Sequence, residues 1–160
     1  MTKIGQKLDK NEYIKYLIDL SIKYNFLSVE DGLYEDDWEG WARVLGTFGG
    51  SMLIVGDDLL VTNPKRVQKA IDGKACNAIL VKPNQIGTIS ETFEVIKLAR
   101  SAGWKIIISH RSGETNDTFI ADFAVGVGGD FVKFGAPARG ERVAKYNRLL
   151  AIEGELGVGK

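Results

Sequence analysis

The chain has 160 residues, of which 44% are hydrophobic and 26% are charged, an ordinary composition for one globular core. Lysine plus arginine and aspartate plus glutamate both number 21, so the formal net charge is zero. This balance argues against nucleic acid as the main partner, because phosphate backbones select proteins with a basic excess. No apolar run approaches the roughly 20 residues of a membrane span. A single cysteine, Cys76, excludes an internal disulfide framework and favours a cytoplasmic location.

Short apolar runs alternate with helical patterns along the chain. The runs with strand character are residues 26–30, 52–55, 78–82, 105–109 and 131–134. Their nearly continuous apolar character predicts strands that are buried on both faces, as in a parallel sheet.

Helices are predicted between these runs from start and stop signals. The signals are Asp9 with Glu12, Asn63 before Pro64, Thr88 with Glu91 and a stop at Gly103, and an amphipathic pattern over residues 141–156. Strand and helix alternate five times, which predicts a single α/β domain over residues 1–160. Its architecture is about five parallel strands with right-handed crossover helices.

A charged residue ends or follows each predicted strand. These residues are Glu30, Asp57, Lys82, His110 and Lys133, spaced by 23 to 28 residues. Because the carboxyl ends of parallel strands converge on one face, the spacing predicts a ring of polar side chains at a common mouth. Each residue taken singly is more simply a solvated loop residue, and the lone histidine a structural one. Because all five strands end in this way, a ligand-binding ring is as good an interpretation as five solvated loop residues.

The residue types in this ring suit one kind of chemistry. Carboxylate oxygens suit a hard cation such as Mg²⁺. A lysine close to bound cations has a lowered pKa and can act as a base. Removal of a proton next to a carboxylate creates a dianion, which a divalent metal and a second lysine can stabilise. The segment SHRSGET over residues 109–115 offers a guanidinium, hydroxyls and a glycine, which suit a phosphate group.

Five segments resemble successive C-terminal motifs of the enolase family. They are SVEDGLYEDDW, VGDDLLVTNPKR, AILVKPNQIGT, SHRSGETNDTFIAD and KFGAPARGERVAKYNRLL. Their order and spacing match the family over residues 13–156, and bacterial enolases are the nearest in character. The resemblance implies a partial TIM-type (β/α) barrel. It also implies the Mg²⁺-dependent, reversible dehydration of 2-phosphoglycerate to phosphoenolpyruvate, a lyase reaction of glycolysis.

The resemblance also implies catalytic roles for four ring residues. Glu30 and Asp57 match two of the three magnesium carboxylates of the family, at the place where substrate also binds. Lys82 matches the general base that removes the C2 proton, and Lys133 matches the second lysine, which holds the substrate carboxylate.

The resemblance also covers the substrate-binding loop of the family. His110, Arg111 and Ser112 match this loop, with His110 among the catalytic residues and with Arg111 and Ser112 at the phosphate. Two departures from the family accompany these matches. Phe134 stands where the family usually has threonine, so it is predicted either to face the core or to crowd the mouth. Gly140 stands where serine is common.

The family has an N-terminal α+β domain and further barrel strands that the resemblance does not cover. The third metal aspartate and the glutamate that protonates the leaving hydroxyl would belong to that part. Turnover is therefore expected only with a complementing N-terminal enolase chain or within a homo-oligomer. The alternative is a catalytically inactive binding or structural module with an open, doubly wound sheet. A receiver-like phosphoacceptor domain fits less well, because its acidic pair should open the chain and its phosphoacceptor should end the third strand.

Overall fold

A computed structural model describes residues 2–3, 6–48 and 50–157 of the chain. Within these ranges the strands are β1 (Thr2–Lys3), β2 (Gln6–Lys7), β3 (Ser28–Glu30), β4 (Leu53–Gly56), β5 (Ala78–Val81), β6 (Lys105–Ser109) and β7 (Phe131–Lys133). The helices are α1 (Lys10–Tyr24), α2 (Trp38–Phe48), α3 (Pro64–Asp72), α4 (Pro83–Ile86), α5 (Ile89–Ser101), α6 (Phe119–Gly126) and α7 (Gly140–Leu156). The five predicted strands are all present, with ends that differ from the prediction by one or two residues.

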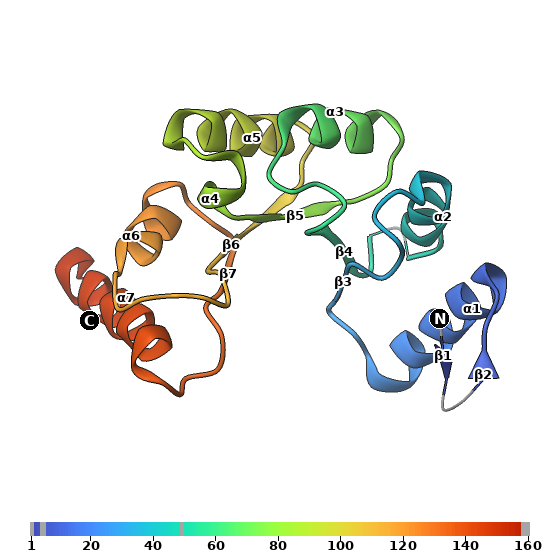
Figure 1. Ribbon diagram of the computed structural model, residues 1–160, viewed down its shortest axis with the longest axis horizontal. Helices are drawn as coiled ribbons and strands as arrows, with labels where there is room; N and C mark the ends of the chain where they lie inside the picture. Colours follow the sequence, from blue (N-terminus) through green and yellow to red (C-terminus); the bar gives the residue numbers. More distant parts are fainter. Residues whose placement is uncertain (1, 4–5, 49, 158–160) are drawn as a thin grey trace.

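The main sheet is parallel and has the strand order β3-β4-β5-β6-β7, which is the order along the chain. Figure 1 shows this sheet as a curled arch with the helices on its outer side. The predicted partial (β/α) barrel is confirmed, and the sheet is not the flat, doubly wound sheet of the alternative. The remaining two strands, β1 and β2, form a small antiparallel ladder before α1.

Three of the predicted helix starts, those of α1, α3 and α5, are confirmed by side-chain caps. Asp9 accepts a hydrogen bond from the Glu12 N–H, and Glu12 accepts one from the Asp9 N–H. Asn63 accepts from the first backbone N–H groups of α3, and Thr88 accepts from the Glu91 N–H at the start of α5. At the far end of α5, Gly103 has a φ of +74°, a left-handed conformation that glycine adopts without strain.

The hydrophobic core lies between the sheet and the outer helices. Alternate strand residues point into it, among them Ile54, Ile79 and Ile106, each no more than 1% exposed. Phe134 is also fully buried in this core and packs edge-on against Tyr146. The substitution at this position therefore adds core volume and does not crowd the mouth of the sheet.

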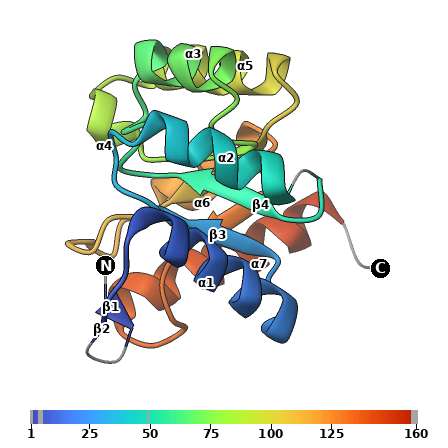
Figure 2. The same cartoon turned by 90° about the vertical axis from the view of Figure 1, so that its right-hand side faces the viewer.

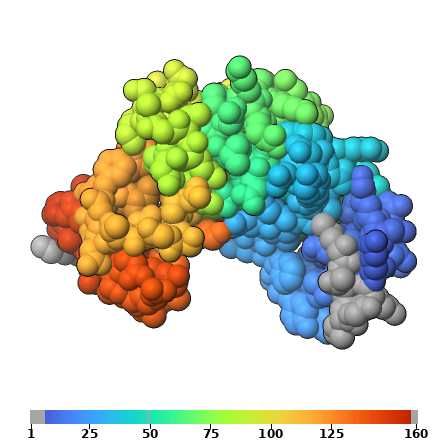
Figure 3. All heavy atoms as spheres, in the orientation of Figure 1, coloured from blue at the N-terminus to red at the C-terminus, as the bar shows by residue number. Residues whose placement is uncertain are grey.

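The inner, concave face of the sheet carries a second and smaller apolar cluster. Val55, Ala78 and Leu80 form it, with Leu53 and Ile107 beside them. Toward the two edges of the sheet the apolar side chains become exposed: Leu27 is 69% and Phe131 is 41% exposed. Figure 3 shows the hollow under the arch between the N-terminal and C-terminal ends of the molecule. Figure 2, seen from the β3 side, shows α1 beneath β3 and α3 and α5 above the sheet.

Among the described residues, no helix combines the length and the apolar character needed to cross a lipid bilayer.

Candidate active site

A polar pocket of about 400 Å³ lies at the carboxyl ends of the central and C-terminal strands. It is lined by Asp57, Asp58, Lys82, Gln85, Ser109, His110, Arg111, Ser112, Lys133 and Arg142. Six of the seven residues named from the sequence are in this lining. The seventh, Glu30, contacts the pocket through its ion pair with Lys133. The spacing of strand ends along the chain thus predicted which side chains meet.

Asp57 and Lys82 form the most enclosed charged pair of the pocket. Lys82 Nζ lies 2.7 and 2.5 Å from the two carboxylate oxygens of Asp57, and the two side chains are 13% and 8% exposed. Asp57 follows β4 and Lys82 follows β5, so the register of neighbouring parallel strands brings them together. The two residues that resemble a metal carboxylate and a general base are therefore direct neighbours.

Glu30 and Lys133 form a second pair across the mouth of the half-barrel. Lys133 Nζ lies 2.6 Å from Glu30 Oε1, although the residues are 103 positions apart in the chain. Glu30 ends β3 and Lys133 ends β7, which are the two edge strands of the sheet. The ion pair therefore reports how strongly the sheet curls, because the edges of a flat five-stranded sheet would be about 19 Å apart.

Asp31 is a carboxylate of this region that was not among the predicted site residues. Its two oxygens accept hydrogen bonds from the backbone N–H groups of Asp57 (3.0 Å) and Asp58 (2.9 Å). Burial raises the pKa of Asp31, although these two hydrogen bonds act in the opposite direction. Asp31 thus fixes the backbone that carries Asp57. The adjacent ED pair in SVEDG was the sequence signal that could have identified it.

The carboxylates of this region have the chemistry of a site for a hard cation. Oxygens of Glu30, Asp31 and Asp57 lie within 4.8 Å of one another. Asp31 binds two backbone N–H groups, whereas Glu30 and Asp57 bind the side chains of Lys133 and Lys82, which could be exchanged for an ion. An all-oxygen donor set suits Mg²⁺, which prefers carboxylates together with water and substrate oxygens. The described residues therefore fit the cofactor that the resemblance implies.

His110 lies between the sheet and α7 with one unusual feature. Its Nδ1 atom is buried and has no hydrogen-bond partner. Burial lowers the pKa of His110, and the cations Arg142, Lys145 and Lys133 lower it further, against the opposing effect of Glu114. Gly135, with a φ of +80°, makes the close packing possible, since a Cβ atom there would lie 3.0 Å from the imidazole and 2.7 Å from Arg142.

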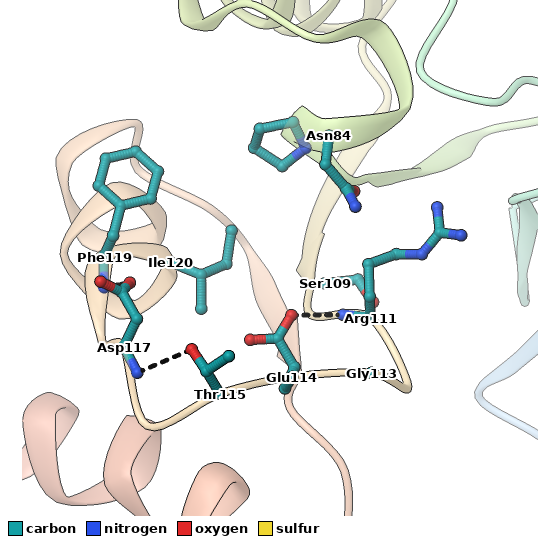
Figure 4. Close-up of a pocket in the computed structure, with 10 residues that line it drawn as sticks. Asn84, Ser109, Arg111, Gly113, Glu114, Thr115, Asp117, Phe119 and Ile120 are labelled. Atoms are coloured by element: carbon teal, nitrogen blue, oxygen red, sulfur yellow. Dashed lines mark hydrogen bonds between the residues drawn. The ribbon is translucent and has the colours of Figure 1, made fainter.

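The segment after His110 is a loop with exposed Arg111 and Ser112 side chains. Figure 4 shows that this loop runs past α4 toward the start of α6, with the carboxylate of Glu114 turned back toward Arg111. On the side of the loop shown there, a further pocket is lined by Asn84, Phe119 and Ile120 among others. The guanidinium and hydroxyl groups are thus presented where an anion in the polar pocket can contact them.

Two further residues hold parts of the site in place, and neither was predicted from the sequence. The buried Thr62 hydroxyl donates to Gln85 (2.7 Å) and accepts from the Lys82 N–H (3.0 Å). Thr62 does so with a φ of +53°, a strained conformation for a β-branched residue. Lys145 on α7 is the second, and it is buried beneath the loop after His110. Neither residue type has a local sequence pattern that indicates such a contact.

The fold and the pocket together define a (β/α)-barrel protein with its polar site at the carboxyl ends of the strands. The model of the enolase C-terminal TIM barrel domain matches residues 2–160. Enolase from Rubrobacter xylanophilus is 55% identical over 153 residues, which are 96% of this chain and 36% of the relative. Enolase from Helicobacter pylori strain J99 is 55% identical over 152 residues, covering 95% and 36% of the two chains. Enolase 1 from Methanospirillum hungatei is 52% identical over 153 residues, covering 96% and 36%.

The chain therefore belongs to the enolase family. It spans about a third of the length of the curated relatives that it matches, 36% in each of these three cases.

Proposed function

We propose that this chain supplies one part of the active site for the reversible dehydration of 2-phosphoglycerate to phosphoenolpyruvate. The observation that carries the proposal is the polar pocket in which Asp57, Lys82 and Lys133 meet Arg111 and Ser112. These groups match, in order, a metal carboxylate, a base, a carboxylate-binding lysine and a phosphate-binding loop. The reaction would take place in the cytoplasm, as the single cysteine favours.

Lys82 is the residue that we propose removes the proton from C2 of 2-phosphoglycerate. The C–H electron pair moves into the carboxylate, and the C3–O bond then breaks as the hydroxyl leaves with a proton as water. In the structure the Lys82 ammonium is held by Asp57. Lys82 must lose this proton before it can accept one, so Asp57 must turn from Lys82 to other partners in the reactive state.

Glu30 and Asp57 are the residues that would hold Mg²⁺. The bound ion supplies positive charge that stabilises the dianion formed on proton removal. Lys133, now paired with Glu30, is placed to donate to the substrate carboxylate from the opposite edge of the mouth. When the site is filled, Lys82 and Lys133 would therefore both leave their protein carboxylate partners and contact substrate or solvent instead.

A complementing part is required, because the pocket holds no proposed donor for the leaving hydroxyl. The carboxylates in its lining are Asp57, which is assigned to the metal, and Asp58, to which the family resemblance gives no acid role. We propose that the partner is the N-terminal part of an enolase, in a separate or continuous chain. It would bring the general acid and a third metal carboxylate and would close the barrel between β7 and β3.

The test is a complementation assay. The chain is mixed with the part of the Rubrobacter xylanophilus enolase that it does not match, and phosphoenolpyruvate formation is followed by ultraviolet absorbance. We expect activity only in the mixture and only with Mg²⁺. Lys82→Ala should lower kcat by about 10³-fold or more, since it removes the base. The matched control is Lys97→Ala, at an exposed position of α5.

Unchanged turnover with Lys82→Ala would rule out the role of Lys82. A stable complex of the two parts without any turnover would instead favour the inactive binding module.

A further inference from the structure

Lys145 is a charged residue with no contact to solvent. It lies on α7, and its side chain is 0% exposed. Its ammonium donates to the backbone carbonyls of Thr115 (2.9 Å), Asp117 (3.1 Å) and Glu141 (2.8 Å) and lies 2.9 Å from Glu114 Oε2. Glu141 is on the same helix, whereas the other three acceptors belong to the loop that follows His110. One side chain thus ties this loop to α7 at three points.

The burial of a lysine has an energetic cost that must be offset. Removing an ammonium from water costs several kcal/mol, and only a complete set of partners in good geometry compensates for it. Lys145 has such a set, since its three N–H groups face four acceptors. A methionine of similar length would fill the same space without this cost. The buried charge is therefore best explained by its role in holding the loop after His110 against α7.

Glu114 transmits this restraint to the substrate-binding end of the loop. One of its carboxylate oxygens faces Lys145, and the other accepts the Arg111 N–H at 2.8 Å. Figure 4 shows this hydrogen bond across the turn from Arg111 to Glu114. Burial alone would raise the pKa of Glu114, but the Arg111 N–H and the Lys145 ammonium outweigh it and lower the pKa. Glu114 therefore stays ionised and keeps both contacts.

The other end of the loop is fixed by the sheet. The His110 N–H donates to the Lys133 carbonyl at 3.1 Å, which continues the β6–β7 ladder. Arg111 follows directly, and its side chain is exposed in the pocket. Between the ladder and α6 the loop has no regular secondary structure. The Lys145–Glu114 pair is thus the buried restraint that sets where the Arg111 backbone lies.

We propose that Lys145 and Glu114 are positioning residues, which pre-form the Arg111–Ser112 turn for an anionic group of the substrate. This proposal rests on the proposed function for the identity of the anion. The ordering of the loop itself is a separate claim. Neither residue lines the polar pocket, because Lys145 is buried beneath the loop and the Glu114 carboxylate faces Lys145.

The test measures amide hydrogen exchange by NMR in the full chain, together with titration by inorganic phosphate. Lys145→Met and Glu114→Ala should each lower the protection of the Arg111 amide about tenfold or more, since the hydrogen bond is lost or loosened. The same variants should weaken phosphate binding, read at the Arg111 and Ser112 amides, by about tenfold. Glu114→Ala lies in the loop and leaves the core intact, so it serves if Lys145→Met does not fold.

Two controls separate positioning from general stability. Ile152→Ala truncates a buried side chain of the same helix, seven residues beyond Lys145, and should destabilise the chain while leaving phosphate affinity unchanged. Lys97→Met makes the same chemical change at an exposed site of α5. The proposal would be overturned if Ile152→Ala lost as much phosphate affinity as a Lys145→Met variant of the same stability. It would also be overturned if Glu114→Ala left the protection of the Arg111 amide unchanged.

The two proposals fail in different ways. If the unsubstituted chain does not bind phosphate, the proposed anion site is wrong, and the positioning of an anion-binding turn falls with it. Loop ordering by Lys145 is still decided by Arg111 amide exchange in that case. If phosphate binds equally well in all variants, the anion site stands and only the positioning role is refuted.

Discussion

At the scale of single residues, His110 differs from the other polar groups of the pocket. Asp57, Lys82, Glu30 and Lys133 all have charged partners, whereas His110 Nδ1 is buried without one. An unpaired buried nitrogen costs free energy, and it costs more when the ring becomes charged and both nitrogens must donate. The histidine is therefore neutral in the folded chain near neutral pH.

This environment predicts a pH dependence. Burial holds the pKa of His110 below its ordinary value of 6.5, so the unfolded chain binds more protons than the folded chain between the two values. Stability from this residue is present above pH 6.5 and is lost as pH falls from there through the lowered pKa. His110 is the only histidine in the sequence, so its imidazole resonance gives an unambiguous NMR titration.

The control is His110→Gln, which should flatten the slope of the unfolding free energy against pH below pH 6.5. A titration midpoint at or above 6.5 would contradict the prediction.

The site residues that were predicted from the sequence differ from those that were not in how their contacts arise. Glu30, Asp57, Lys82, His110 and Lys133 end or follow strands, and the carboxyl ends of parallel strands lie at the same side of the sheet. Asp31, Thr62 and Lys145 act by binding backbone groups of other loops. Those loops are placed by long-range packing, so a charged residue in a helix such as α7 reads from the sequence as solvent-exposed. The second kind of residue could be identified only in three dimensions.

At the scale of the elements, helix starts were predicted well because their signals are local. Asn63 accepts hydrogen bonds from the Lys65 N–H (2.9 Å) and the Arg66 N–H (3.3 Å), as the Asn-Pro pair indicated. The short helix α4, which begins at Pro83 without a side-chain cap, and the β1–β2 ladder were not predicted. The curl of the sheet was expected from the family resemblance alone, because strand patterns fix neither curvature nor closure.

A substitution at this cap tests the local argument. Asn63→Ala should lower the free energy of unfolding by about 1 kcal/mol, because two N–H groups at the start of α3 lose their acceptor. Urea denaturation followed by circular dichroism measures the change. Asn116→Ala, at an exposed loop position, is the matched control and should change stability by less than about 0.5 kcal/mol. A cap variant as stable as this control would contradict the prediction.

At the scale of the whole molecule, the described residues form an open half-barrel. Within this described part, β3 and β7 are the edge strands of the sheet, and the inner face between them is apolar. A pocket of about 220 Å³ on this face is lined by residues of all five strands, from Ser28 on β3 to Val132 on β7. Exposed strand edges beside apolar side chains are a template for pairing with another chain. The architecture and the proposed active site therefore point to the same proposed partner.

The exposed residues at these edges provide the test of that partner. Leu27 precedes β3 and Phe131 begins β7, and both are substantially exposed in the chain alone. The double variant Leu27→Lys, Phe131→Lys should change the stability of the chain by less than about 1 kcal/mol, because little burial is lost. It should weaken binding to the N-terminal enolase part by about a hundredfold, since two lysines would have to be desolvated at a closing interface. Isothermal titration calorimetry measures the affinity, and Leu150→Lys, at an exposed position of α7, is the control. If the double variant and this control bind equally well, the barrel is not closed along β3 and β7, and the partner must contact another face.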